Sequence, residues 1–346
     1  MINVGIIGAT GYVGIEIVRL LQNHPEFNIS TVVSQSFVGK KISDVYPNLR
    51  NVFDLECEEL DIEKISPKAD IFVTALPHGI SKDVIPKLVE KGKIIMDHSG
   101  DFRYKDVEVY EKWYNTKHNI PELLELAVYG LPELHRKDIK NAKIIANPGC
   151  YPTCSVLGLA PLLSNKLIET KNIIIDAASG VTGAGRNTDL PNQFCECTEN
   201  FKAYKVSTHR HTSEIEQELS LLAGEEIIVS FTPHLVPMKR GMLSTIYANL
   251  TSEKSASELI SLYKEFYKDE FFVRILDEGK LPETKFVAGS NYIDISIVVD
   301  KRLNRVVVLS AVDNLGKGAA GQAVQDMNII YGFPEHTGLT TPGLYL

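Results

Sequence analysis

A strand that runs into a glycine-rich turn and a helix opens the chain, and it constrains the fold more than any other stretch. Residues 2–7 form a nearly unbroken apolar run, typical of a strand buried on both faces of a parallel sheet. Gly8, Gly11 and Gly14 follow with the spacing of a dinucleotide-binding turn, and an amphipathic helix continues to about Gln22. The pattern predicts a doubly wound α/β domain that binds a dinucleotide, with a plain structural turn as the alternative.

Strands and helices continue to alternate up to residue 146, as a doubly wound sheet requires. Further strands are expected at 29–34, 70–76, 93–97 and 143–146, and a helix at 81–91. Ligands of such sheets gather beyond the carboxyl ends of the strands, where His78, Ser99, Asp101 and Arg103 are expected. The Arg103 guanidinium can bind a phosphate through two N–H groups, and a surface salt bridge is the alternative.

The residues after the second strand indicate which dinucleotide binds. An NAD-selective domain has Asp or Glu about 20 residues beyond the last glycine, to hold the ribose hydroxyls. This chain has Ser34, Gln35 and Ser36 there, followed by Lys40 and Lys41. Because no carboxylate repels a 2′-phosphate, we expect NADPH, with the two serines as its ligands ahead of the lysines.

Cys150 lies where the strand at 143–146 gives way to a helix. Gly149 precedes it and Pro152 follows, and proline suits the first turn of a helix. Unpaired N–H groups and the helix dipole stabilise a thiolate at such a position. We therefore expect a nucleophile here, whereas an isolated cysteine is more often a buried small hydrophobe.

Strands predominate after Cys150 and predict a second domain, an α+β fold with a mixed sheet and helices on one face. Strands are expected at 172–178, 203–209, 226–235, 242–250, 292–300 and 305–312, with helices at 152–165, 213–222 and 255–268. The helical segment 313–332 begins with small residues and is expected to return to the first domain. The predicted domains are therefore 1–149 with 313–346, and 150–312.

Two histidines, His209 and His211, stand at the expected junction between a strand and a helix. Ser213 and Glu216 have the spacing of a capping box, which places the helix start at Ser213. In an extended chain residues two apart face the same side, so both rings are expected to face one cleft and Arg210 to face away. One histidine of the pair is the candidate proton carrier.

The glycine-rich segment 179–186 follows another expected strand. Its backbone N–H groups can bind an anion or a substrate carbonyl, and a flexible connector is the alternative.

Composition disfavours several classes of partner. The chain of 346 residues has 36 basic and 44 acidic residues and a net charge of −8, which argues against nucleic acid and anionic membranes. No apolar run reaches the roughly 18 residues of a membrane span, and the chain opens on a strand where a signal peptide would stand. Five cysteines are an odd number and fit a reducing, cytoplasmic compartment. Cys195 and Cys197 have no second pair at zinc-site spacing, so no metal is expected.

Several segments together resemble the N-acetyl-gamma-glutamyl-phosphate reductase family, part of the aspartate-semialdehyde dehydrogenase-like superfamily. The resemblance runs the whole length and rests on residues 8–14, 99–103, 147–153, 179–186, 209–211, 233–241 and 314–318. The Cys150 and His209 motifs are specific jointly, whereas many dehydrogenases share the glycine turn. Ser213 departs from the family, which more often has proline there.

The resemblance implies a function and residue roles. It implies the reduction of an acyl phosphate in arginine biosynthesis by a homodimer or homotetramer, with Cys150 forming a thioester and His209 as acid and base. Cofactor contacts are expected from Gly8, Thr10, Gly11, Tyr12, Val13, Gly14, Ser34, Ser36, Ser179, Gly180 and Asn314. Substrate contacts are expected from Ser99, Arg103, Asn147, Thr182, Arg186 and His211. The alternatives are a related substrate, aspartyl phosphate or a carrier-linked aminoadipyl phosphate, and a non-catalytic dinucleotide sensor.

Overall fold

The computed structural model describes residues 1–186 and 188–345, which divide into two compact units. Unit 1 comprises Met1–Pro148 and Ala319–Thr340, and unit 2 comprises Gly149–Gly318 and Thr341–Leu346. Residues 313–318 and 341–345, which the sequence analysis grouped with the first domain, thus belong to unit 2, and Leu346, grouped with them, lies outside the described residues. The chain passes from unit 1 to unit 2 one residue before Cys150.

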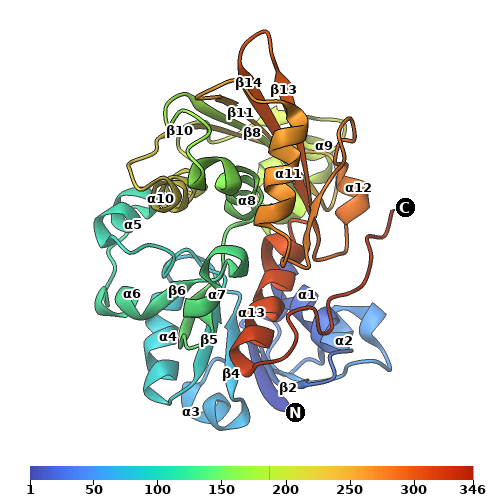
Figure 1. Ribbon diagram of the computed structural model, residues 1–346. Coiled ribbons are helices and arrows are strands. Elements are labelled where there is room, and N and C mark those ends of the chain that lie inside the picture. Colours follow the sequence, from blue (N-terminus) through green and yellow to red (C-terminus); the bar gives the residue numbers. More distant parts are fainter. Residues whose placement is uncertain (187, 346) are drawn as a thin grey trace. The chain divides into compact units, whose positions relative to one another are not determined.

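Unit 1 is built on a seven-stranded sheet in which every pairing is parallel, in the order β3-β2-β1-β4-β5-β7-β6. Figure 1 labels β2, β4, β5 and β6 of this sheet. Its strands are β1 (Ile2–Ile7), β2 (Phe27–Val33), β3 (Cys57–Glu58), β4 (Ile71–Thr74), β5 (Ile94–Asp97), β6 (Ala127–Tyr129) and β7 (Ile144–Ala146). Its helices are α1 (Tyr12–Leu21), α2 (Ile42–Val45), α3 (Ile62–Ile65), α4 (Ser81–Glu90), α5 (Val107–Tyr114), α6 (Glu122–Leu126), α7 (Pro132–Ile139) and α13 (Gly321–Tyr331). The prediction of a doubly wound parallel sheet is confirmed, although the short helices between residues 106 and 140 were not assigned.

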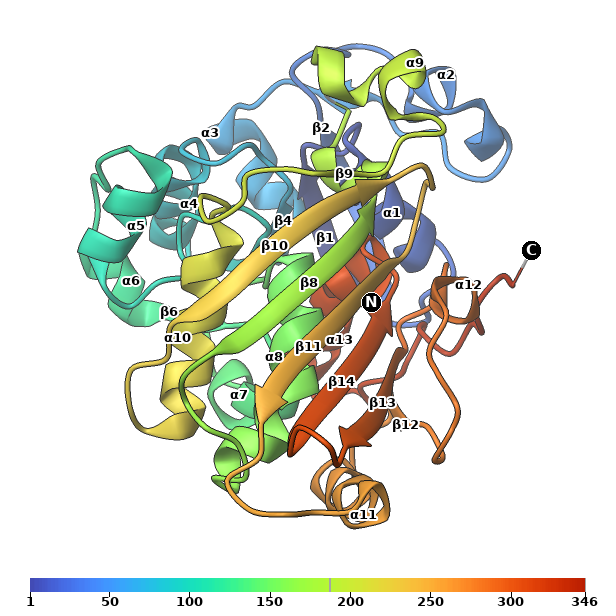
Figure 2. The same ribbon diagram turned by 90° about the horizontal axis from the view of Figure 1, so that it is seen from above.

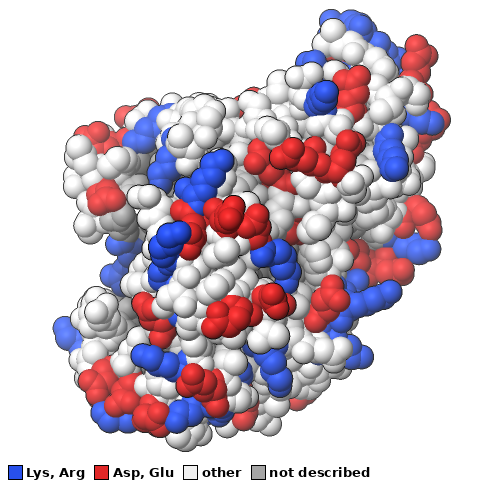
Figure 3. Space-filling model, turned by 90° about the vertical axis from the view of Figure 1, so that its left-hand side faces the viewer, with Lys and Arg blue, Asp and Glu red and all other residues white. Residues whose placement is uncertain are grey.

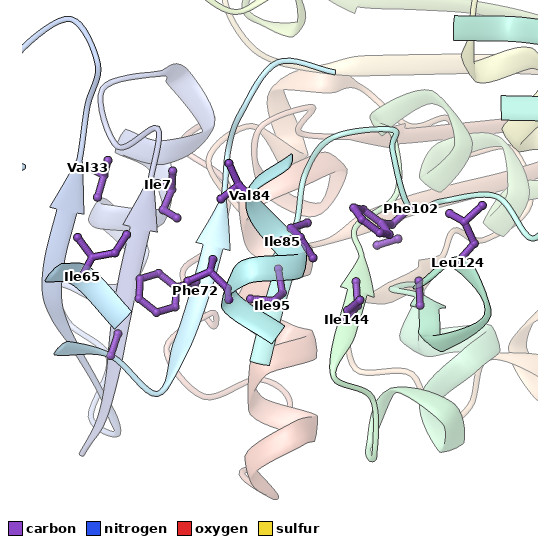
Figure 4. Close-up of a cluster of buried hydrophobic side chains, with 14 residues drawn as sticks. Ile7, Val33, Ile65, Phe72, Val84, Ile85, Ile95, Phe102, Leu124 and Ile144 are labelled. Atoms are coloured by element: carbon purple, nitrogen blue, oxygen red, sulfur yellow. The ribbon is translucent and has the colours of Figure 1, made fainter. Parts of the chain in front are cut away.

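Both faces of this sheet are buried, which explains its unbroken apolar strands. On one face Ile7, Phe72, Ile95 and Ile144, from four neighbouring strands, pack against α4 in the core cluster of Figure 4. On the other face α13 contacts both α1 and α7. Burial on two sides leaves only the strand ends for polar side chains.

Unit 2 contains a mixed seven-stranded sheet in the order β12-β13-β14-β11-β8-β10-β9. Its strands are β8 (Ile173–Gly180), β9 (Lys202–Ala203), β10 (Val229–Val236), β11 (Met242–Asn249), β12 (Val273–Ile275), β13 (Ile293–Asp300) and β14 (Arg305–Val312). Its α-helices are α8 (Cys150–Ser164), α9 (Phe194–Cys197), α10 (His211–Ala223), α11 (Ala256–Phe266) and α12 (Thr284–Val287). The predicted mixed sheet is confirmed.

Helices α8, α10 and α11 all contact this sheet, and Figure 2 looks onto its other face, where the strands lie in front of α8 and α10. Burial alternates along β8, β10 and β11, with every second residue buried. This period of two is expected of strands that are covered on one face and open on the other.

The strand expected at 203–209 and the capping box at Ser213 are wrong. Lys205 and Ser207 have φ of 46° and 57°, so the chain turns and β9 ends at Ala203. Helix α10 already begins at His211, and the Ser213 hydroxyl donates to the Arg210 carbonyl inside the helix. The Glu216 carboxylate instead accepts a hydrogen bond from the N–H of Val229.

Candidate active site

Cys150 is the first residue of α8, as predicted, and Gly149 is the N-cap. Residues 151–163 of this helix are all buried, whereas Cys150 itself is partly exposed. The N–H of Gly149 donates to the buried Glu214 carboxylate at 2.8 Å, and Pro152 has no N–H. The N–H groups of Cys150 and Tyr151 belong to the first turn of the helix, whose N–H groups lie outside the intrahelical hydrogen-bond pattern.

Two glycines let other elements approach Cys150 closely. A Cβ at Gly149 would lie 2.4 Å from Nε2 of His211, and a Cβ at Gly318 would lie 2.8 Å from Cβ of Cys150. The His211 ring thus packs on the residue before the cysteine. Gly318 belongs to a π-helical turn, 316–320, that packs against the cysteine itself.

His209 lies in a cluster of rings beside Cys150. Its ring centroid is 4.7 Å from that of His211 and 5.5 Å from those of Tyr151 and Tyr204, and Phe231 closes the cluster at 5.7 Å. Burial, and then the positive charges of Lys205 and Arg210, lower the pKa of His209 to about 3. The two histidines therefore meet as expected, although a turn and not an extended strand brings them together.

Three residues of this site were missed by the sequence analysis, namely Tyr151, Tyr204 and Glu214. Tyr151 and Tyr204 carried no distinguishing pattern. Glu214 follows His211 by three residues, so it lies on the same side of the helix. Its role at Gly149 would have been detectable had the helix start been assigned to His211.

In unit 1 the glycine turn leaves room for a phosphate at the start of α1. Gly8 has φ +87°, and a Cβ there would lie 2.4 Å from the Ala75 carbonyl oxygen. A Cβ at Gly14 would lie 2.3 Å from the Gly8 carbonyl oxygen, so this glycine packs the helix onto the turn. Gly11 is the N-cap, with no side-chain cap, and Thr10, Tyr12 and Val13 flank it. The residues present fit a dinucleotide pyrophosphate.

The residues that follow β2 differ in exposure. Ser34 is 2% exposed, and its hydroxyl lies 2.8 Å from that of Thr10. Ser36 is exposed, as is Lys40, which lies over the Phe37 ring. Lys41 forms an ion pair with Asp54 at 3.0 Å. Ser36 and Lys40 are thus the more accessible groups, and Ser34 supports the glycine turn.

Ser99, Arg103 and Asn147 lie together beyond the carboxyl ends of β5 and β7. The Ser99 hydroxyl donates to Asp97 at 2.6 Å. The Arg103 guanidinium is 6% exposed and donates to the carbonyls of Asn147 and His98, at 2.8 and 3.0 Å. Arg103 is therefore buried and not at the surface, and it holds two loops together. Burial, and then the charge of Arg103, lower the pKa of His98 to about 3.

The glycine-rich segment after β8 forms an ordered turn in unit 2. The Asn314 amide donates to the Thr182 hydroxyl at 2.9 Å and accepts from the N–H of Gly241 at 2.9 Å. Gly180 lies against the chain at Lys239, where a Cβ would lie 2.7 Å from the carbonyl oxygen. Ser179, the residue before Gly180, is buried, and Arg186 is exposed. The predicted cofactor and substrate residues are thus divided between the two units.

Within residues 1–186 and 188–345, no three His, Cys, Asp or Glu side chains are grouped to hold a metal ion. All five cysteines are free thiols. The same part of the chain contains no helix long and apolar enough to cross a membrane.

Comparisons with known proteins agree with this division. Residues 3–142 match the family described as semialdehyde dehydrogenase, NAD binding domain, and residues 150–314 match the semialdehyde dehydrogenase dimerisation domain. An N-acetyl-gamma-glutamyl-phosphate reductase of Acetivibrio thermocellus is 79% identical over 346 residues, 100% of each chain. Aspartate semialdehyde dehydrogenase II of Vibrio cholerae has the same fold, with a TM-score of 0.74 at 19% identity over 96% of this chain and 99% of that chain.

Aspartate semialdehyde dehydrogenase of Candida albicans, whose structure was determined with NADP, gives a TM-score of 0.73 at 18% identity over 96% of this chain and 98% of that chain. The resemblance found in the sequence is confirmed by the full-length match to the bacterial reductase. The chain belongs to the semialdehyde dehydrogenase family, and within it to the N-acetyl-gamma-glutamyl-phosphate reductases.

Proposed function

We propose that the chain catalyses the NADPH-dependent reduction of N-acetyl-gamma-glutamyl phosphate to the semialdehyde, with release of phosphate, in arginine biosynthesis in the cytoplasm. The observation that carries the proposal is Cys150 at the partly exposed first position of a buried helix, with the paired rings of His209 and His211 at the residue before it. Membership of the reductase family supports the substrate and the pathway.

Cys150 acts as the nucleophile of this reaction. Its thiolate attacks the acyl carbon, phosphate leaves, and a thioester remains on the sulfur. The helix dipole favours the thiolate before the attack, and the position of Cys150 and Tyr151 in the first turn of α8 supports their N–H groups as donors to the oxyanion that develops during it. Glu214 holds the N–H of Gly149, so this part of the turn is fixed before substrate arrives.

His209 either takes the proton of the Cys150 thiol before the attack or stabilises the oxyanion of the tetrahedral intermediates. His211, Thr182, Arg186, Ser99, Arg103 and Asn147 are proposed to bind the substrate. The buried guanidinium of Arg103 holds the loops of Ser99 and Asn147 in place, as its hydrogen bonds to the two carbonyls support.

NADPH is the proposed cofactor, held at the start of α1 by residues 8–14, with further contacts from Ser34, Ser36, Ser179, Gly180 and Asn314. When bound, it supplies the hydride that reduces the thioester. The open N-cap at Gly11 supports binding of the pyrophosphate, and exposed Ser36 and Lys40 support a 2′-phosphate near the end of β2. The NAD binding domain match and the NADP-containing relative of the same fold agree with this proposal.

We also propose a homodimer or homotetramer, formed through unit 2. The dimerisation-domain match covers residues 150–314. The residues of β10 and β11 that are not buried belong to the face of the sheet shown in Figure 2, and most of them are half-buried: Thr232, His234, Val236, Leu243, Thr245, Tyr247 and Asn249. On the face shown in Figure 3, basic and acidic side chains are interspersed, which does not suggest nucleic acid as a partner. Sedimentation of the purified chain measures the assembly.

The test of function is the reverse reaction, in which NADP is reduced in the presence of phosphate and a semialdehyde. N-acetyl-glutamate semialdehyde should be used with at least about 100-fold higher kcat/KM than aspartate semialdehyde, a difference of about 2.7 kcal/mol. A preference for aspartate semialdehyde or a carrier-linked aminoadipyl analogue would reassign the substrate. NADPH binding without any turnover would indicate a dinucleotide sensor.

A further inference from the structure

Both ring nitrogens of His209 have partners whose hydrogen-bonding roles can be worked out. A backbone N–H can only donate, a backbone carbonyl can only accept, and a tyrosine hydroxyl has one proton to give. A neutral imidazole carries one proton, on Nδ1 or on Nε2, and its partners determine which. The contacts around His209 therefore specify its protonation state.

On the Nδ1 side, the backbone N–H of His211 donates to the ring at 3.1 Å. Nδ1 must accept this bond, so it cannot carry a proton of its own. An imidazolium would place its Nδ1–H against the N–H of His211. The turn that replaces the expected strand at 203–209 is what creates this contact.

On the Nε2 side, two tyrosines form a chain that ends on a carbonyl. The Tyr151 hydroxyl donates to the carbonyl of His234 at 3.2 Å, so it must accept from Tyr204, which donates to it at 3.2 Å. With its only proton used, the Tyr204 oxygen can only accept from Nε2 of His209, which lies 3.5 Å away. Burial raises the pKa of Tyr204 to about 12 and also raises that of Tyr151, so both hydroxyls keep their protons at neutral pH.

Resting on the proposed function, we propose that Tyr151, Tyr204 and the backbone N–H of His211 are positioning groups that hold His209 as a neutral Nε2–H donor. In this state His209 stabilises the oxyanion of the tetrahedral intermediate by hydrogen bonding and does not take the thiol proton. A neutral imidazole can serve as such an electrophile in an enzyme. The thiol of Cys150 loses its proton to solvent before attack, and the Nε2–H is shared between the Tyr204 oxygen and the oxyanion, so that Tyr204 still orients the ring when the oxyanion forms.

Nuclear magnetic resonance of the full chain, with 15N-labelled histidine, tests the assignment without reference to turnover. The His209 signals are identified by their loss in His209→Asn. We expect the Nε2–H tautomer of the neutral ring at every pH between 5.5 and 8.5. An Nδ1–H tautomer, or an imidazolium at neutral pH, would overturn the proposal. If the tautomer is found but no semialdehyde is oxidised, the proposed function fails and the protonation state stands.

Kinetics test the chain of hydroxyls. Tyr204→Phe should lower kcat about three- to tenfold with an unchanged KM, as expected for the loss of one hydrogen bond. Once the Tyr204 hydroxyl is absent, no hydrogen bond links the Tyr151 hydroxyl to His209, so Tyr151→Phe/Tyr204→Phe, which keeps both rings, should match Tyr204→Phe within about twofold. Tyr263→Phe, which removes a buried hydroxyl bonded to the Gly158 carbonyl, is the matched control and should keep its kcat. If the losses of kcat from the two substitutions multiply in the double variant, or if Tyr204→Phe keeps its kcat as the control does, the proposed chain of hydroxyls is wrong.

Discussion

The two units each contain a seven-stranded sheet, yet they place reactive groups in different ways. Unit 1 buries both faces of a parallel sheet, so its polar residues gather at strand ends, as Ser99, Arg103 and Asn147 do. Unit 2 buries one face of a mixed sheet, and its candidate nucleophile lies at the end of the buried helix α8. A sheet edge suits the binding of a long cofactor, whereas a helix N-terminus suits the stabilisation of one anionic atom. We infer that the main role of unit 1 is to bind the cofactor and that of unit 2 is to carry the nucleophile.

The largest test of this comparison is Cys150→Ser. Serine is nearly isosteric but its hydroxyl stays protonated, so we expect turnover to fall by at least about 10⁴-fold while NADPH binding by unit 1 is unchanged. Steady-state rates and a fluorescence titration measure the two quantities. Cys154→Ser is the control: Cys154 is buried one turn along α8 and hydrogen-bonds to Ser310, so its loss should spare most of the activity. If Cys150→Ser keeps more than about one hundredth of the wild-type turnover rate, Cys150 is not the nucleophile.

His209→Asn should lower kcat by roughly 10²- to 10⁴-fold, the usual contribution of a positioned donor or acid, with little change in NADPH affinity. His211→Asn keeps the backbone N–H that His209 accepts and should act mainly on the KM for substrate. The same steady-state assay measures both variants. If His211→Asn lowers kcat and His209→Asn acts mainly on the KM, the roles assigned to the two histidines must be exchanged.

A change confined to unit 1 should affect the cofactor and leave the chemistry intact. Ser36→Asp places a carboxylate at an exposed position after β2, and we expect NADPH binding to weaken at least tenfold, about 1.4 kcal/mol, while NADH binding changes little. The ratio of kcat/KM for the two cofactors is the measurement. Asn23→Asp adds the same charge in the loop before β2 and should leave the ratio unchanged. Ser34→Asp is a weaker probe, because Ser34 is buried against Thr10. If the wild-type protein prefers NADH, the prediction that the residues after β2 bind the 2′-phosphate of NADPH is wrong.

The smallest expected difference concerns acid stability. Burial lowers the pKa of His24, His98 and His118 in unit 1, and of His209 in unit 2. Below about pH 6.5 the unfolded chain binds these protons and the folded chain does not, so stability falls as pH falls, by at most about 1.4 kcal/mol per pH unit for each group. The raised pKa of buried Asp97 opposes this loss in part.

We therefore expect unit 1 to lose more stability than unit 2 between pH 7 and 5, by about 1 kcal/mol. Hydrogen exchange of β4 and β11 amides measures the two units separately. His98→Gln should reduce the difference. Equal losses in the two strands would show that histidine burial does not distinguish the units.

Local patterns predicted most of the fold, because they depend on neighbours in the chain. The apolar run at 2–7 predicted a strand buried on both faces, and it forms as expected, as does the strand predicted at 242–250. Helix α8 and Cys150 at its start followed from Gly149 and Pro152. The failure at 203–209 has a physical reason, since Lys205 and Ser207 adopt positive φ, which no sequence pattern there favours.

By itself, the sequence determined which residue types are available for chemistry: a cysteine at a helix start, a histidine pair and a glycine turn after a strand. Which groups these residues contact was decided only by the tertiary structure. Tyr204 reaches His209 because a turn replaces a strand, and Glu214 reaches Gly149 because α10 packs on α8. Periodicity along a chain specifies which side of an element is buried, whereas hydrogen bonds between distant residues depend on how the elements pack.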